Sequence, residues 1–140
     1  MLGEALAAAE AAYLAYISEV DAILRLESPV EGIKDFTNTS YGDQRTGELS
    51  AFLSSQLRST GSTLVDSISL AEYSQRGTPE TISIYTCTDV SGTRLYNAAG
   101  EDVTPPDRDT RVPVMISLEA HSSGRVLVSG DQLWTGENFC

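Results

Sequence analysis

Basic residues are scarce in this 140-residue sequence. Nine lysines and arginines stand against 20 aspartates and glutamates, so the formal net charge is −11, and Lys34 is the only lysine. Proteins bind nucleic acids largely because Lys and Arg displace counterions from the phosphates. A chain this acidic repels other polyanions, and we therefore expect no nucleic-acid partner.

Long apolar runs are also missing. No stretch approaches the roughly 18 apolar residues that a transmembrane helix requires. The opening residues MLGEAL lack the basic and continuous apolar regions of a signal peptide. We expect that a targeting segment has been left off this chain and that Met1 is a start added for expression. Membrane attachment would then depend only on that absent N-terminal anchor.

The common catalytic and cofactor motifs are absent. The sequence has one histidine and contains no Walker loop, GxGxxG or GxSxG pattern. Its two cysteines do not form a CxxC pair, which argues against a zinc site and thioredoxin-like chemistry. We therefore predict no catalytic residues, no cofactor and no metal site.

The two cysteines, Cys87 and Cys140, are the most informative residues present. Two isolated thiols could be unpaired core residues of a cytosolic protein. However, Cys140 is the last residue of the sequence, and chain ends fray, so it is a poor core residue. A Cys87–Cys140 disulfide would close a long loop and contribute roughly 4 kcal/mol in the chain-entropy model. Such a bond predicts an extracytoplasmic location, secreted or anchored at the cell envelope.

The first half of the chain shows helical periodicity. Its length and 41% hydrophobic content predict a single domain, residues 1–140, with its own core. Residues 2–27 are predicted as one long amphipathic helix, because apolar residues recur at helical spacing without an internal Pro. Residues 30–45 are expected to form a short helical turn and a loop. A second helix is predicted over 47–60, with Thr46 as its N-cap and Gly61 just beyond its end.

The second half shows the alternation of β-strands. Pro113 lies inside one of these segments and suggests an edge strand or a strand start. The predicted strands, including a short hairpin in their midst, cover residues 63–75, 81–90, 93–96, 101–103, 111–120 and 126–134. Helices followed by strands indicate an α+β fold in which the helices pack in a curved antiparallel sheet of four or more strands.

Three segments resemble a known family. They are residues 7–16 (AAAEAAYLAY), 87–100 (CTDVSGTRLYNAAG) and 134–140 (WTGENFC). Together with the element order they resemble the NTF2-like, or cystatin-like, cone fold, and more narrowly the small secreted or lipoprotein domains of actinobacteria whose function is unassigned. The resemblance implies a pairing of Cys87 with Cys140. It also implies lipoprotein anchoring, although the lipobox that usually precedes such domains is not in this sequence.

The cone fold has a pocket between its long helix and its sheet. Tyr13, Tyr16, Tyr85 and Trp134 are the candidate residues to line a ligand pocket there. The alternative is that the tyrosines of the first helix simply pack against the sheet. In catalytic members of the fold the pocket holds an Asp or His base beside a Tyr donor.

Other polar residues have a simpler interpretation. His121 lies in a predicted turn at a strand end, where a solvated histidine is expected rather than a general base. Asp66 shares a predicted strand face with apolar residues but is expected to be exposed. A cluster of three aspartates around two prolines could bind calcium, although its spacing matches no EF-hand and nearby arginines offset its charge. Its members are Asp102, Asp107 and Asp109.

These features favour a non-enzymatic cell-envelope domain that binds a protein partner or a small ligand. Two other functions remain open. One is a pocket enzyme of isomerase or hydrolase type that uses Tyr16 with an acid such as Asp35. The other is a structural subunit of an envelope or secretion assembly. We expect a monomer or a dimer.

Overall fold

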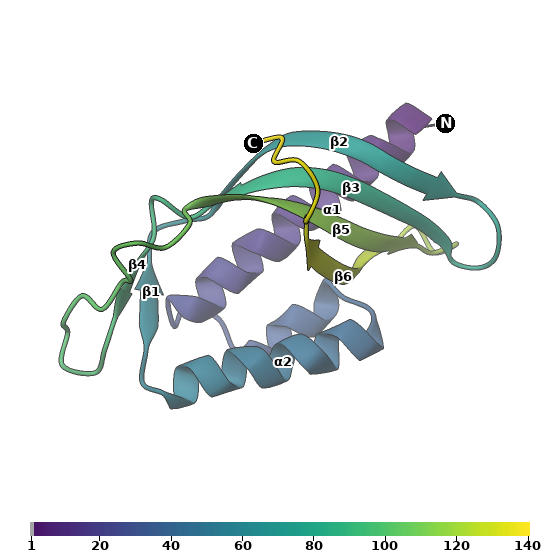
Figure 1. Ribbon diagram of the computed structural model, residues 1–140. Coiled ribbons are helices and arrows are strands. Elements are labelled where there is room, and N and C mark those ends of the chain that lie inside the picture. The colour runs from purple at the N-terminus through teal and green to yellow at the C-terminus, as the bar shows by residue number, and fades with distance from the viewer. Residues whose placement is uncertain (1) are drawn as a thin grey trace.

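The computed structural model describes residues 2–140 and confirms the α+β class. A long N-terminal helix and two further helices pack on a four-stranded antiparallel sheet, and a separate two-stranded sheet lies at one end (Figure 1). The helices are α1 (Leu2–Leu24), the 3-10 helix η1 (Val30–Asp35) and α2 (Thr39–Ser54). The strands are β1 (Arg58–Thr60), β2 (Leu64–Ser74), β3 (Glu80–Asp89), β4 (Arg94–Tyr96), β5 (Arg111–Ala120) and β6 (Val126–Leu133).

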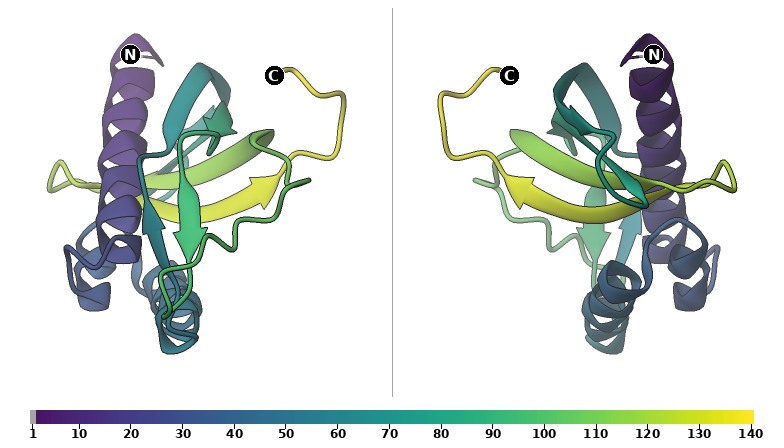
Figure 2. Two further views of the ribbon diagram at one scale, coloured as in Figure 1. Left: turned by 90° about the vertical axis from the view of Figure 1, so that its left-hand side faces the viewer. Right: turned by 90° about the vertical axis from the view of Figure 1, so that its right-hand side faces the viewer.

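The main sheet has the order β2-β3-β5-β6, and every neighbouring pair is antiparallel. Helix α1 runs across one face of the sheet, whereas α2 lies beyond the β6 edge of the sheet (Figure 1). Figure 2 shows α1 on one side of the sheet and the segment after β6 on the other. We call the face against α1 the inner face and the opposite one the outer face.

The core lies between α1 and the inner face. Five α1 residues at spacings of three and four are buried, as the helical period predicts: Ala9, Tyr13, Tyr16, Val20 and Ile23. Opposite them, inward-facing residues of β3, β5 and β6 are almost fully buried: Ile82, Ile84, Ile116, Leu118 and Val128. These two sets form one hydrophobic cluster, so burial of apolar area between helix and sheet is the main stabilising contribution.

Helix α1 ends three residues earlier than expected. The prediction extended to residue 27, but the helix stops at Leu24 and Leu26 has a φ of 66°. A left-handed residue cannot continue a right-handed helix. No helix among residues 2–140 is long and apolar enough to cross a membrane.

The second helix is displaced from its predicted position. It covers Thr39–Ser54 rather than 47–60, and it begins at Asn38, whose side-chain oxygen accepts a hydrogen bond from the Tyr41 amide at 2.9 Å. Thr46 is therefore not an N-cap; it lies inside the helix and its hydroxyl donates to the Gly42 carbonyl. The prediction was wrong because Asn, Ser and Gly are turn residues as well as helix starters.

Residues 58–60 were predicted as the end of a helix and instead form β1. This strand pairs with β4, more than thirty residues later in the chain, and the Arg58 guanidinium stacks on the Tyr96 ring. Pro113 is the third residue of β5, which lies between β3 and β6, so of the two alternatives the edge strand was wrong and a position near the strand start holds. The proline precedes the first residue of β5 that pairs with β6, Val114.

The end of α1 is tied to the start of β2 by one carboxylate. Asp21 is buried and accepts two hydrogen bonds from Thr63, one from its amide at 2.7 Å and one from its hydroxyl at 2.8 Å. Arg25, one turn later, donates to the Gly61 carbonyl at 2.8 Å. Gly61 has a φ of 82°, and a Cβ there would overlap the carbonyl oxygen of Gly92. This junction fixes where the sheet begins relative to α1.

We expect Gly61→Ala to destabilise the protein more than Gly124→Ala. Both glycines have positive φ, so an alanine at either costs roughly 1–2 kcal/mol. Nothing lies within 4 Å of a Cβ on Gly124, whereas the clash at Gly61 adds roughly 1–3 kcal/mol of overpacking. Urea unfolding of the two variants measures the difference, and equal losses would contradict the close approach of Gly61 to Gly92.

Candidate functional site

The inner face carries a hydrogen-bonded network of buried tyrosines. Tyr16 on α1 and Tyr41 on α2 are only 4% and 5% exposed, and their hydroxyl oxygens are 3.1 Å apart. Tyr41 also donates to Asp131 on β6 at 2.7 Å, and Arg45 donates to Tyr16 at 2.8 Å. The network therefore joins both long helices to the edge strand of the sheet.

Burial makes these hydroxyls weak acids. Desolvation raises the pKa of Tyr13, which is 3% exposed, to about 12. Burial also raises the pKa values of Tyr16 and Tyr41 above their ordinary range, although Arg45 partly opposes this at Tyr16. All three hydroxyls consequently remain protonated at neutral pH and act as hydrogen-bond donors and acceptors rather than as bases.

The outer face carries a different aromatic group. Tyr85 points to this face from β3, and the rings of Trp134 and Phe139 meet it edge-on, with centroids 5.1 and 5.6 Å away. Trp134 and Phe139 belong to residues 134–140, a segment without regular secondary structure that crosses the outer face after β6 (Figure 1). We call residues 134–140 the crossing segment.

A disulfide fastens the crossing segment to the sheet. Cys140 is bonded to Cys87 of β3, with a Cα–Cα distance of 5.7 Å and a sequence separation of 53 residues. This confirms the predicted pairing. The segment is held at two other points: the Trp134 amide donates to the Pro113 carbonyl at 3.0 Å, and Arg111 donates to the Cys140 carbonyl.

The four residues predicted to line a ligand pocket thus lie on two opposite faces. Tyr13 and Tyr16 are packed between α1 and the inner face, where Tyr13 approaches Thr88 at 3.4 Å. Tyr85 and Trp134 are together on the outer face. The structure does not bring the two pairs into one pocket, and ligand binding by either pair stays a prediction.

A hollow of about 260 Å³ lies beside the crossing segment. Its lining residues come from the start of β5, the end of β6 and the crossing segment: Asp109, Arg111, Val112, Pro113, Leu133, Trp134, Gly136 and Asn138. Leu133 is 59% exposed and Phe139 is 41% exposed, which is high for side chains of this size. Apolar side chains are therefore presented to solvent next to a hollow.

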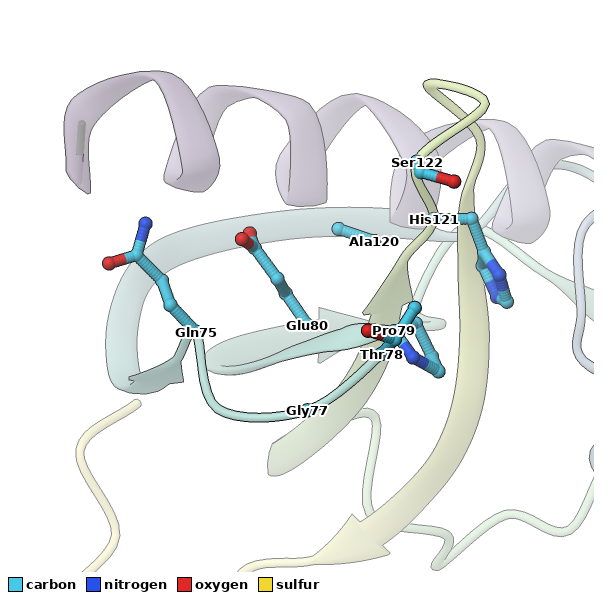
Figure 3. Close-up of a pocket in the computed structure, with 8 residues that line it drawn as sticks. All are labelled: Gln75, Gly77, Thr78, Pro79, Glu80, Ala120, His121 and Ser122. Carbon is cyan, nitrogen blue, oxygen red and sulfur yellow. The ribbon is translucent and has the colours of Figure 1, made fainter.

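A second hollow, of about 400 Å³, lies where the β2–β3 and β5–β6 turns meet, and Figure 3 shows its lining residues. His121 is in the β5–β6 turn, as expected, and its ring contacts Glu119 at 3.2 Å. Glu80 accepts a hydrogen bond from Tyr73 at 2.7 Å. The side chains of Gln75 and Glu80 point to one side in Figure 3, and the imidazole points away from them.

The acids considered as bases or metal ligands are dispersed. Asp35 is exposed at the end of η1, whereas the hydroxyl of Tyr16 contacts Tyr41 and Arg45, so the structure does not join Tyr16 to Asp35. Asp66 is exposed on β2, and its hydrogen bond with Arg111 lowers the pKa of its carboxyl group.

The aspartates around the prolines do not share one set of contacts. Arg94 pairs with Asp102 at 2.8 Å, and this hydrogen bond lowers the pKa of Asp102 to about 2. Asp109 instead lines the hollow beside the crossing segment. Within residues 2–140, no group of three or more His, Cys, Asp or Glu side chains is placed to hold a metal ion.

Three residues of the inner tyrosine network and one of the outer aromatic group were not identified from the sequence: Tyr41, Arg45, Asp131 and Phe139. Tyr41 and Arg45 lie in a segment that was predicted as a loop, so their inward position could not be inferred. Asp131 is 90 residues from its partner Tyr41. Phe139 did have a signal, since it directly precedes the cysteine that was predicted to be fastened to the sheet.

No protein-family model and no curated protein matches this chain. Among solved structures, the chain is similar to the crystal structure of the intermembrane space region of the chloroplast protein ARC6. The TM-score is 0.65 and the sequence identity 9%, and the match covers 89% of this chain and 92% of that chain. At this identity the likeness shows a shared α+β fold alone.

We expect alkaline pH to destabilise the protein through Tyr13. The unfolded chain releases this proton near pH 10, whereas the folded protein holds it until about pH 12. The stability that this group contributes is therefore complete below pH 10 and is lost as the pH rises toward 12. Urea unfolding of wild type and Tyr13→Phe across this range measures it; an equally steep loss in both proteins would contradict the role of Tyr13.

We expect reduction of the disulfide to lower the free energy of unfolding by roughly 2–4 kcal/mol, because it releases a long loop in the unfolded chain. The matched control is Cys87→Ala with Cys140→Ala, whose stability reductant should leave unchanged. Unfolding of both proteins with and without reductant makes the comparison. If wild type is equally stable in both conditions, the bond does not constrain the chain.

Proposed function

We propose that this protein is a non-enzymatic extracytoplasmic domain that binds a protein partner through the outer face of its sheet. The observation that carries the proposal is the outer aromatic group. The helices leave this face uncovered (Figure 2), and Tyr85, Trp134 and Phe139 gather on it, with Phe139 exposed. Exposed apolar groups rimmed by polar residues are typical of protein interaction sites.

The packing of the inner face supports a non-enzymatic role. The space between α1 and the sheet, where catalytic members of the NTF2-like fold hold their base, is filled here by Tyr13, Tyr16 and Tyr41. Their hydroxyls are used in joining the helices to the sheet. We assign the domain to the NTF2-like group on its long helix and curved sheet, and this assignment belongs to the proposal.

The disulfide supports a location outside the cytoplasm. Structural disulfides persist in oxidising compartments and are rare in cytosolic proteins. The similar ARC6 region belongs to the intermembrane space, although that likeness concerns the fold. A disulfide that fastens an aromatic segment across a sheet face also fixes the surface that a partner would meet.

Site-specific crosslinking in the producing cells tests the proposal. A photo-reactive residue at position 132 lies on the outer face, since Gln132 is opposite Met115 and Met115 is opposite Tyr85. The same residue at position 8 lies on exposed α1, on the other side of the sheet. We expect one protein to be crosslinked from position 132 and not from position 8. We also expect both cysteines to be unreactive to thiol reagents until the disulfide is reduced.

Two outcomes would contradict the proposal. Crosslinking from position 8 alone would place the partner on the helical side, and crosslinking from neither position would show that no partner contacts the outer face. Two free thiols in the protein taken from its cells would remove the argument for an oxidising compartment.

A further inference from the structure

We infer that the hollow beside the crossing segment receives a basic side chain from the partner, presented next to an apolar one. This inference rests on the proposed function and names the chemistry of the partner segment. It depends on three properties of the described surface: exposed apolar area, a hollow of side-chain size and an excess of negative charge.

The apolar part of the surface is fixed in place. Phe139 is exposed, while Trp134 is held between the ring of Tyr85 and the backbone of Gly136. A Cβ on Gly136 would come within 2.9 Å of three indole atoms, so the backbone lies directly against the ring. Because these groups are already ordered, an apolar side chain that packs on them loses little entropy from this side of the interface.

The hollow, about 260 Å³, is large enough to hold one long side chain. Its only cationic lining residue is Arg111, and that guanidinium already donates to Asp66 and to the Cys140 carbonyl. An acidic partner group would have to compete with both. Arg111 is therefore a structural cation rather than a free anion-binding residue.

One carboxylate lines the hollow, and two more lie on segments that border it, one of them opposite Arg111. Asp109 lines it, Glu137 lies in the crossing segment, and Asp89 is paired across the sheet with Arg111 in the strand register. Neither Asp109 nor Glu137 takes part in an ion pair among residues 2–140. With a net charge of −11 behind them, these groups attract a Lys or Arg and repel an acidic segment.

Trp134 is the only tryptophan, so its fluorescence reports on this site alone. The probes are two blocked peptides, Lys-Phe-Lys-Leu-Lys and Glu-Phe-Glu-Leu-Glu, titrated to about 1 mM, the weak end of measurable affinity. We expect a saturable change in Trp134 emission with the basic peptide, weakened by added salt, and none with the acidic peptide. Equal responses, or no response to the basic peptide, would overturn the inference.

Two pairs of variants with the same change in net charge test whether the basic peptide binds at the hollow. Asp109→Asn with Glu137→Gln should weaken binding of the basic peptide by about three- to tenfold, because each rim charge contributes modestly. Glu4→Gln with Glu10→Gln makes the same charge change on α1, across the sheet, and should leave the affinity within about twofold. Equal weakening by both pairs would mean that net charge alone attracts the peptide, which contradicts a site at the hollow.

The contacted segment of the partner separates this inference from the proposed function. Mass spectrometry of the adduct formed from position 132, which precedes the lining residue Leu133, identifies the partner residues that lie near the hollow. A segment with Lys or Arg beside an apolar residue supports the inference. An acidic or purely polar segment, or a second copy of this chain, overturns it and leaves binding at the outer face in place. A lack of any adduct is instead a failure of the proposed function.

Discussion

The packing of α1 against one face of the four-stranded sheet is the constraint on which the rest of the molecule depends. Both surfaces are apolar along one stripe, and each can leave water only by covering the other. The stripe of Ala9, Tyr13 and Tyr16 meets the inward residues of the central strands. Asp21 then fixes the end of the helix to the start of β2, so the sheet begins in a defined position.

This arrangement divides the sheet into two faces with different roles. On the inner face the tyrosine hydroxyls bond to one another, to Asp131 and to Arg45, which satisfies polar atoms that would be costly to bury alone. The outer face receives no helix. It is crossed instead by a short segment whose position depends on the disulfide, and the aromatic side chains of that segment remain partly exposed.

The fold class and the disulfide could be predicted because their signals are local or few in number. Alternation marked β2 to β6 closely, and only two cysteines were available to pair. The start of α2 could not be predicted, since Asn38 suits a turn as well as a helix cap. The four pocket candidates were grouped by residue type, although strand alternation places Tyr85 on the face opposite Ile84 and so away from Tyr13. Pairings such as Tyr41 with Asp131 depend on tertiary structure alone.

A comparison of two single substitutions tests the division of roles most directly. Tyr41→Phe removes two inner-face hydrogen bonds, to Asp131 and with Tyr16, and Phe139→Ala removes outer-face aromatic area. Each variant is measured for its free energy of unfolding and for its affinity to the crosslinked partner. The account predicts that Tyr41→Phe loses roughly 1–2 kcal/mol of stability with unchanged affinity. It predicts that Phe139→Ala loses about tenfold or more in affinity with a smaller loss of stability. Weakened partner binding by Tyr41→Phe, with none by Phe139→Ala, would contradict it.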